Sequence, residues 1–170
     1  MDSKLQIISG IYRGRKLNLP VDARPTQNLA RIALFNMLEG IIVDPYAPIV
    51  VWDAFAGSGS LGIECLSRYP QSQVLFTDVA YKSIQTVRSN LAALTVGSRA
   101  KTFQADAIAS IQQWGVMSDL IFVDPPYPRA NLGASILFIT QNTPLVRIWG
   151  CKIYCLLFPN NNRSFACNFL

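Results

Sequence analysis

Histidine is absent from this chain of 170 residues, and cysteine is scarce. A histidine base, a histidine metal ligand and most zinc sites are therefore excluded. The four cysteines have no metal-ligand spacing, so we expect reduced, largely buried thiols at Cys65, Cys151, Cys155 and Cys167. The sequence predicts no metal site.

Long apolar runs are also lacking. No stretch of about eighteen apolar residues occurs, and residues 1–4 do not begin a signal-peptide hydrophobic region. We therefore expect a cytoplasmic, monomeric protein that does not enter a membrane. With 51% hydrophobic and 15% charged residues, the chain can bury a sizeable core, which predicts one domain over residues 1–170.

Acidic residues are few near the amino terminus, where positive charge gathers. Residues 1–31 hold six basic side chains against Asp2 and Asp22, which gives +4 of the chain's net charge of +5. The six are Lys4, Arg13, Arg15, Lys16, Arg24 and Arg31. A basic segment on a nearly neutral body is typical of a phosphate-binding element, although an ordinary solvated hairpin explains it equally well.

Two patterns predict the structure of this basic segment. Apolar and polar residues alternate over 6–12 and 16–19, which predicts two strands with an exposed turn at Arg13-Gly14-Arg15. Thr26 can then cap a helix that ends at Gly40. The expected apolar face of this helix consists of Ala30, Ala33, Leu34, Met37 and Leu38. Residues 1–40 are thus predicted to be a basic β-hairpin followed by a helix.

The rest of the chain alternates between strand and helix patterns. The expected strands are 49–55, 73–78, 101–105 and 119–124, and the expected helices are 60–69, 80–94 and 107–114. A helix over 131–141 and a fifth strand over 151–158 follow. This alternation predicts the α/β class, with a doubly wound, mostly parallel Rossmann-like sheet. Only one short strand fits after residue 158, so we expect either a shortened sheet or a diverged carboxyl-terminal end.

One strand-to-helix loop contains Gly57, Gly59 and Gly62, which match the G-x-G-x-x-G pattern of a nucleotide-binding loop. Asp53 precedes this loop at the end of the strand. Its carboxylate would repel a pyrophosphate and attract a cationic ligand. S-adenosylmethionine carries a sulfonium and an ammonium group, so the loop favours this cofactor over NAD.

Four aspartates follow four of the predicted strands at equivalent places: Asp53, Asp78, Asp106 and Asp124. Because ligands of open α/β sheets bind at the carboxyl ends of the strands, we expect all four to line one crevice. Asp78 lies at the offset from Gly57 at which an acid binds ribose hydroxyls, and Asp106 is placed to accept from an adenine amino group. Each of them, taken singly, could instead cap the following helix.

Asp124 begins the sequence Asp124-Pro125-Pro126-Tyr127, directly after a buried strand. Neither proline has an amide hydrogen, so this loop cannot extend a strand ladder. The Asp124 carboxylate and the Pro125 carbonyl suit the two hydrogens of a planar NH2 group, and the Tyr127 ring suits stacking on a base. A tight proline turn is the alternative.

Three segments together resemble the bacterial RsmD-type methyltransferases. They are residues 53–62, residues 124–127, and an amino-terminal stretch with Ile8-Ser9-Gly10, Arg13-Gly14-Arg15-Lys16-Leu17 and Arg24-Pro25-Thr26. The resemblance implies methylation of the exocyclic N2 of a guanine in 16S ribosomal RNA within small-subunit particles, with S-adenosylmethionine as cofactor. The chain departs from the family pattern at Asn28, Leu29, Ile32 and Ala80.

The resemblance also implies a role for each site residue. Catalysis would fall to Asp124, Pro125, Pro126 and Tyr127. The cofactor would be bound, within a catalytic core of residues 41–170, by Asp53, Phe55, Gly57, Ser58, Gly59, Leu61, Asp78 and Asp106. RNA would be contacted by Arg13, Arg15, Lys16, Arg24, Thr26 and Arg31.

Three other functions stay open on the sequence. An amino-methyltransferase acting on DNA adenine or on a protein glutamine would have the same planar NH2 group as its target. A nicotinamide oxidoreductase is disfavoured by Asp53 and by the lack of histidine. A non-catalytic RNA-binding relative is compatible with the altered carboxyl-terminal end.

Overall fold

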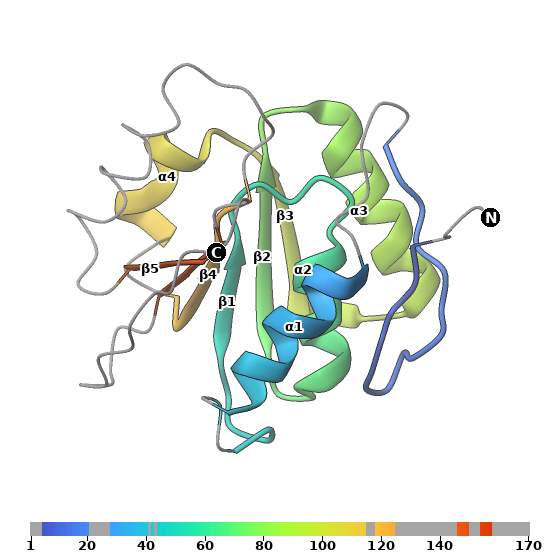
Figure 1. Ribbon diagram of the computed structural model, residues 1–170. Coiled ribbons are helices and arrows are strands. Elements are labelled where there is room, and N and C mark those ends of the chain that lie inside the picture. The colour runs from blue at the N-terminus through green and yellow to red at the C-terminus, as the bar shows by residue number, and fades with distance from the viewer. Residues whose placement is uncertain are drawn as a thin grey trace.

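The computed structural model describes residues 5–20, 28–40, 42, 44–114, 118–124, 146–149 and 154–157. At its centre is a sheet of four parallel strands in the order β3-β2-β1-β4 (Figure 1). The strands are β1 Val50–Asp53, β2 Gln73–Asp78, β3 Ala100–Gln104 and β4 Leu120–Phe122. The first four predicted strands are therefore confirmed, with small differences at their ends.

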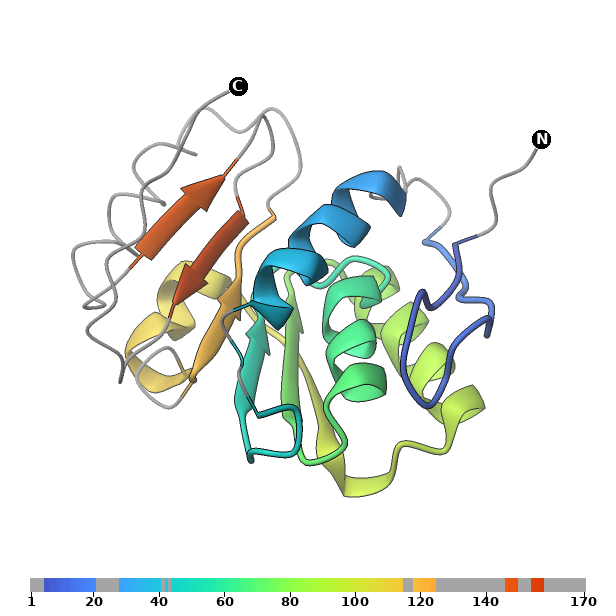
Figure 2. The same cartoon turned by 60° about the horizontal axis from the view of Figure 1, so that its bottom comes forward.

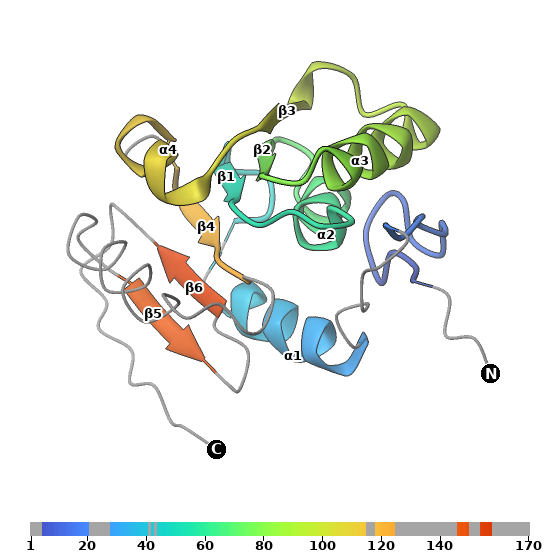
Figure 3. The ribbon, with the colours of Figure 1, turned by 90° about the horizontal axis from the view of Figure 1, so that it is seen from above.

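Helices cover both faces of this sheet. They are α1 Asn28–Glu39, α2 Ser60–Arg68, α3 Tyr81–Leu94 and α4 Ala107–Trp114, with a short 3-10 helix at Gly97–Arg99. Seen from above, α1, α2 and α3 lie on one face and α4 lies on the other (Figure 3). The doubly wound α/β prediction is thus confirmed. None of the helices in the described ranges is both long and apolar enough to cross a bilayer.

The buried strands are apolar because helices exclude water from both faces of the sheet. Val51 and Trp52 of β1 have no exposed surface, and all of β4 is buried. Hydrogen bonds within the sheet extend to a side chain, since Trp52 Nε1 donates to Thr77 Oγ1 of β2 at 2.9 Å. Thr77 Oγ1 in turn donates to the Ala54 carbonyl at 3.0 Å, which fixes the chain where it leaves β1.

Helix α1 packs on the sheet through a face that differs slightly from the predicted one. Leu34 and Leu38 are wholly buried as expected, while Ala30, Ala33 and Met37 are only half-buried. Phe35 is also wholly buried, and its ring centre lies 6.1 Å from that of Phe122 in β4. The fourth buried residue of this face is Arg31, which completes the helical spacing 31, 34, 35, 38.

Residues 5–20, called the arm below, lie along α2 and α3 (Figure 1). Leu5, Ile7 and Leu17 of the arm belong to the same hydrophobic core as the sheet. Within the described residues, the predicted two-stranded hairpin is reduced to one antiparallel bridge between Gln6 and Lys16. The hairpin prediction was therefore too extensive.

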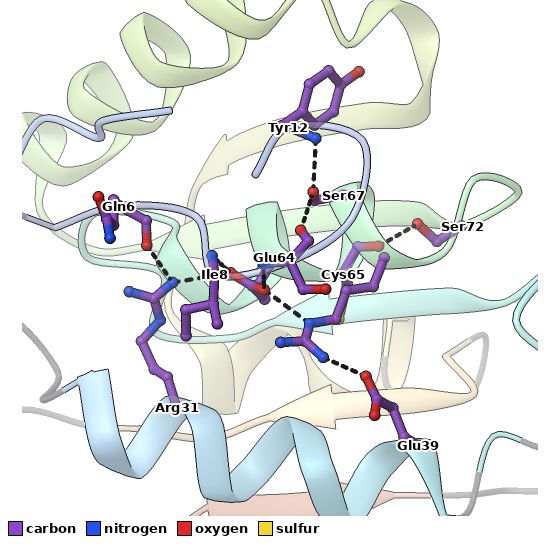
Figure 4. Close-up of polar contacts among 11 residues, drawn as sticks. Gln6, Ile8, Tyr12, Arg31, Glu39, Glu64, Cys65, Ser67 and Ser72 are labelled. Carbon is purple, nitrogen blue, oxygen red and sulfur yellow. Dashed lines mark hydrogen bonds and ion pairs between the residues drawn. The ribbon is translucent and has the colours of Figure 1, made fainter. Parts of the chain in front are cut away.

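The pairing within the arm is short because four of its amide groups bond to α2, while those of Ile7, Gly14 and Leu17 bond across the arm. The amides of Ile8 and Ser9 each donate to the Glu64 carboxylate at 2.9 Å. The Ile11 amide donates to the Ser67 carbonyl at 2.9 Å, and the Tyr12 amide donates to Ser67 Oγ at 3.0 Å. Figure 4 shows the contact of Ile8 with Glu64 and that of Tyr12 with Ser67.

The carboxyl-terminal prediction needs a correction. The fifth strand was expected over 151–158 in the parallel sheet, but β6 Tyr154–Leu157 pairs antiparallel with β5 Val146–Trp149 in a separate two-stranded sheet beside β4 (Figure 2). An antiparallel partner needs only a short connection, whereas a parallel one needs a crossover of about a dozen residues or more. The predicted helix over 131–141 lies outside the described residues.

Gly62 sets the distance between α2 and β2. A Cβ atom at this position would lie 2.3 Å from Cε1 of Phe76 and 2.9 Å from Cγ1 of Val74, closer than atoms can approach. Both neighbours are buried in the centre of the sheet, so they have no free volume to move into. The third glycine of the G-x-G-x-x-G pattern is therefore required for helix-to-strand packing.

We predict that Gly62→Ala lowers the free energy of unfolding by roughly 1–3 kcal/mol, the usual range for overpacking a buried site. Gly40→Ala is the matched control, because its Cβ would lie 3.4 Å from the Met37 carbonyl oxygen, an ordinary contact. Urea unfolding of both variants measures the difference. Equal midpoints for the two variants would contradict the packing role of Gly62.

Candidate active site

The carboxyl ends of β1, β2 and β4 lie next to one another, and each is followed or ended by an aspartate. Asp53 ends β1, Asp78 ends β2, and Asp124 lies two residues past β4. Because β1 lies between the other two strands, the three carboxyl groups converge on one edge of the sheet. The predicted gathering of Asp53, Asp78 and Asp124 is therefore seen in the structure.

Asp53 has the most unusual environment of the three. Its side chain is buried, and Oδ2 accepts a hydrogen bond of 3.1 Å from the Gly62 amide. Burial raises the pKa of this carboxyl to about 7 from an ordinary value of 3.8. The Gly62 N–H lowers this pKa, and the charges of Asp124 and Asp78 raise it. A cation beside Asp53 would favour its ionised form, so the site is suited to a positively charged ligand.

Asp78 fixes the first part of the glycine loop. Its Oδ2 accepts from the Gly57 amide at 2.9 Å, and its Oδ1 accepts from the Ala80 amide at 2.8 Å. The side chain is half-buried, so it joins the loop after β1 to the end of β2 while keeping one side toward solvent.

Asp106 behaves differently from the other three aspartates. Its Oδ1 accepts from the amides of Ile108 and Ala109 at 2.9 and 3.0 Å, in the first turn of α4. This is the helix-capping role that the sequence left open. The side chain is exposed, and a contact with adenine stays a prediction.

The glycine loop adopts a conformation that leaves space for a ligand. Gly57 and Gly59 have φ values of +53° and +78°, and a Cβ at Gly57 would meet nothing within 4 Å. The Gly59 amide donates to the Ala56 carbonyl at 2.6 Å, which closes the turn before α2 begins. The open backbone at Gly57 lies near the buried carboxyl of Asp53. This arrangement fits a ligand that has a flat, polar body and a cationic end.

Two other predicted cofactor residues are placed less directly. Phe55 is half-buried at the start of the loop. The Leu61 side chain is part of the hydrophobic core, so a contact from Leu61 to a ligand would have to come from its backbone. No group of three or more candidate metal ligands occurs in the described part of the chain.

The arm presents positive charge at the far end of α2. Arg13, Arg15 and Lys16 are exposed, and Arg15 Nη2 donates to the Ala93 carbonyl near the end of α3 at 2.7 Å. The bonds to Ser67 place the tip of the arm at the last turn of α2, whose nine residues span about 13 Å from the glycine loop. The basic tip and the carboxylates thus lie at opposite ends of one helix.

The prediction that Arg31 contacts RNA is wrong. Arg31 has no exposed surface, and its Nη2 donates to Glu64 Oε2 and to the Gln6 carbonyl, both at 3.0 Å (Figure 4). A guanidinium with no exposed surface, whose charge is paired with a buried carboxylate, has no access to a phosphate. Five predicted residues, namely Arg24, Thr26, Pro125, Pro126 and Tyr127, lie outside the described residues.

Sequence reasoning missed Asn90 of α3. Its Nδ2 donates to the Ser58 carbonyl in the glycine loop and to the Asn18 carbonyl in the arm, both at 3.0 Å. Asn90 follows Val87 and precedes Leu94 at helical spacing, and all three side chains are buried. A polar residue on an apolar helix face was the available signal, since buried amides need partners.

Comparisons with known proteins agree with this arrangement. The sequence profile of a family described as conserved hypothetical protein 95 matches residues 5–147. Ribosomal RNA small subunit methyltransferase D of Escherichia coli (strain K12) is 38% identical over 141 residues, which cover 82% of this chain and 68% of the relative. The protein of the same name from Haemophilus influenzae is 34% identical over 146 residues, covering 82% of this chain and 72% of the relative.

Solved structures extend the similarity to three dimensions. The structure of yhhF from Escherichia coli matches with a TM-score of 0.67 and 34% identity, covering 82% of this chain and 74% of that one. A second structure, from Haemophilus influenzae, matches with a TM-score of 0.65 and 26% identity, covering 92% and 98% of the two chains. From its sequence motifs, its sheet order and these matches, the chain belongs to the RsmD family of methyltransferases, which the conserved hypothetical protein 95 profile describes.

Proposed function

We propose that the protein uses S-adenosylmethionine to methylate the exocyclic N2 amine of a guanine in 16S ribosomal RNA of the small ribosomal subunit. The observation that supports this most directly is the convergence of Asp53, Asp78 and Asp124 beside an open glycine loop. The names of the relatives, ribosomal RNA small subunit methyltransferase D, support the class of substrate.

The chain offers a distinct group to each part of the methyl donor. Asp53, when ionised, would balance the positive charge of the methionine end. Asp78, whose carboxylate lies at the end of β2, would accept from the ribose hydroxyls. Gly57, where a Cβ would meet nothing within 4 Å, would allow close approach of the backbone to the ligand. When bound, S-adenosylmethionine supplies an electrophilic methyl group on a sulfonium.

The target amine would be held on the other side of β1. Asp124 follows β4, the strand next to β1, and its carboxylate would accept one N–H of the base. The sequence predicts that the Pro125 carbonyl accepts the second N–H and that the base, turned out of its stack, lies on the Tyr127 ring. With both hydrogens held, the nitrogen lone pair would point toward the methyl group. Most of the rate acceleration would come from this positioning.

Transfer of labelled methyl groups tests the proposal. Purified small subunits, naked 16S ribosomal RNA, DNA and a glutamine-containing protein are offered side by side, and digestion of the product identifies the modified atom. Label in guanine N2 of ribosomal RNA is the expected result. Label in adenine of DNA or in glutamine would show that the proposed substrate is wrong. No label in any substrate would favour a non-catalytic RNA-binding protein.

Asp124→Ala is expected to lower kcat by about a hundredfold or more, by analogy with the loss of one preorganised polar group at a reacting centre. The melting temperature and the affinity for S-adenosylhomocysteine should change little. Asp44→Ala is the matched control, because Asp44 is exposed, lies before β1, and its carboxylate accepts from the Tyr46 amide at 2.9 Å. Normal kcat in a folded Asp124→Ala variant would rule out this mechanism.

Asp53 makes the affinity for S-adenosylmethionine depend on pH. Its pKa is about 7, so the fraction of ionised Asp53 rises between pH 6 and pH 8, and affinity should rise roughly tenfold over this interval. Asp53→Asn should bind more weakly and with a flatter pH dependence. Calorimetric titration measures the affinity for S-adenosylmethionine at pH 6 and at pH 8. Equal affinities at the two pH values in the unaltered protein would contradict the role of Asp53.

The raised pKa of Asp53 also affects how the stability of the ligand-free protein depends on pH. Folding raises the pKa of Asp53 from 3.8 to about 7, so the folded state favours the protonated form. The stabilisation that results is complete below about pH 4 and is lost as the pH rises through about 7. Urea unfolding should therefore show Asp53→Asn losing less stability than the unaltered protein between pH 5.5 and pH 8.

The exposed arginine at the arm tip tests RNA contact. Arg13→Ala should weaken RNA binding and lower the slope of log affinity against log salt by about 0.7–1, because one fewer counterion is released. Arg13→Lys keeps the charge and should keep the slope. Filter binding at several salt concentrations distinguishes them. An unchanged slope in Arg13→Ala would mean that the tip is an ordinary solvated turn.

A further inference from the structure

Asn90 connects the arm to the glycine loop through three hydrogen bonds. Its Oδ1 accepts from the Asn18 amide at 2.8 Å, and its Nδ2 donates to the carbonyls of Asn18 and Ser58, both at 3.0 Å. A side-chain amide has two donor hydrogens, so both donors of Asn90 are used. The side chain is only 2% exposed, so bulk water cannot replace either partner.

The two hydrogen bonds between Asn90 and Asn18 resemble those between paired residues of two strands. The side-chain amide of Asn90 takes the place of a peptide group and meets both the N–H and the carbonyl of one arm residue. Asn18 lies two residues past the bridge between Gln6 and Lys16, where the second leg of the arm runs toward the carboxyl edge of the sheet. Asn90 therefore holds Asn18 of the arm and the Ser58 carbonyl of the glycine loop through one side chain.

The third bond acts on the loop itself. Ser58 lies between Gly57 and Gly59, whose positive φ values give the loop its shape. An amide group is planar, so its oxygen and nitrogen turn together. A displacement of Asn18 that rotates this plane must also move Nδ2 away from the Ser58 carbonyl. All three bonds form only when the arm and the loop are both in place.

We propose that Asn90 is a positioning residue that couples RNA binding at the arm to cofactor binding at the glycine loop, so that each ligand strengthens the binding of the other. The inference rests on the proposed function, because it takes the arm as an RNA contact and the loop as the cofactor site. A ligand that orders one segment lowers the cost of ordering the other, which gives positive coupling. Thermodynamic linkage requires the effect to be equal in both directions.

The coupling is measured as the ratio of S-adenosylhomocysteine affinities with and without saturating 16S ribosomal RNA. In the unaltered protein this ratio should be about fivefold or more. In Asn90→Ala it should fall to about one, while each ligand still binds alone. Ser89→Ala is the matched control on the same helix, because its hydroxyl accepts only a long bond of 3.4 Å from the exposed Asn18 Nδ2, and it should keep the full ratio.

A second measurement needs no variant. The amide proton of Asn18, which bonds to Asn90, should exchange with solvent at least fivefold more slowly when S-adenosylhomocysteine is bound to the unaltered protein. Unchanged exchange would overturn the proposal, as would a full coupling ratio in Asn90→Ala or a ratio of one in the unaltered protein. If the unaltered protein bound neither S-adenosylhomocysteine nor RNA, the proposed function itself would fail.

Discussion

The buried carboxylate of Glu64 is the interaction on which the arrangement of the amino-terminal third depends. It accepts from the amides of Ile8 and Ser9, from Arg31 Nη2 at 3.0 Å and from Arg68 Nε at 2.8 Å. These donors come from the arm, from α1 and from α2. An ionised carboxylate away from water is costly unless it is fully hydrogen-bonded, so the three segments must assemble together to satisfy it.

The network around Glu64 continues into the sheet. Arg68 also pairs with Glu39 at the end of α1, and its guanidinium lies 4.8 Å from the ring centre of Phe35. Phe35 in turn contacts Phe122 of β4. A polar cluster between two helices is thus continuous with the apolar core, and the position of the arm is linked to the strand that precedes Asp124.

The sequence predicted most of the sheet and the place of the carboxylates, because strand patterns and the carboxyl-end rule depend on local residue order. It did not predict the burial of Arg31, since charge alone suggests a surface residue. The helical spacing 31, 34, 35, 38, together with Glu64 inside the apolar pattern of α2, held the necessary signal. The short arm bridge and the pairing of β5 with β6 depend on contacts between distant residues, which local patterns do not contain.

Positive charge lies at the carboxyl-terminal end of α2, and negative charge lies at its amino-terminal end. This separation determines which charged groups can bind at each end of the helix. The arm tip attracts phosphates, whereas the carboxyl groups of Asp53, Asp78 and Asp124 repel them. A nucleic-acid backbone is therefore favoured at the end of α2 and disfavoured at its start. Neutral and cationic groups are the species that this carboxylate edge favours.

The strand order has a consequence for how the molecule assembles during translation. β1 pairs with β2 and β2 pairs with β3, so these three strands can associate as soon as residue 104 has left the ribosome. β4 pairs with β1, and the paired residues Val51 and Leu120 are far apart in the sequence. The three strands β1, β2 and β3, which include Asp53 and Asp78, therefore form from pairings between successive strands, and Asp124 joins them last. A nascent chain stopped between residues 104 and 120 would contain Asp53 and Asp78 at the edge of a three-stranded sheet and lack Asp124.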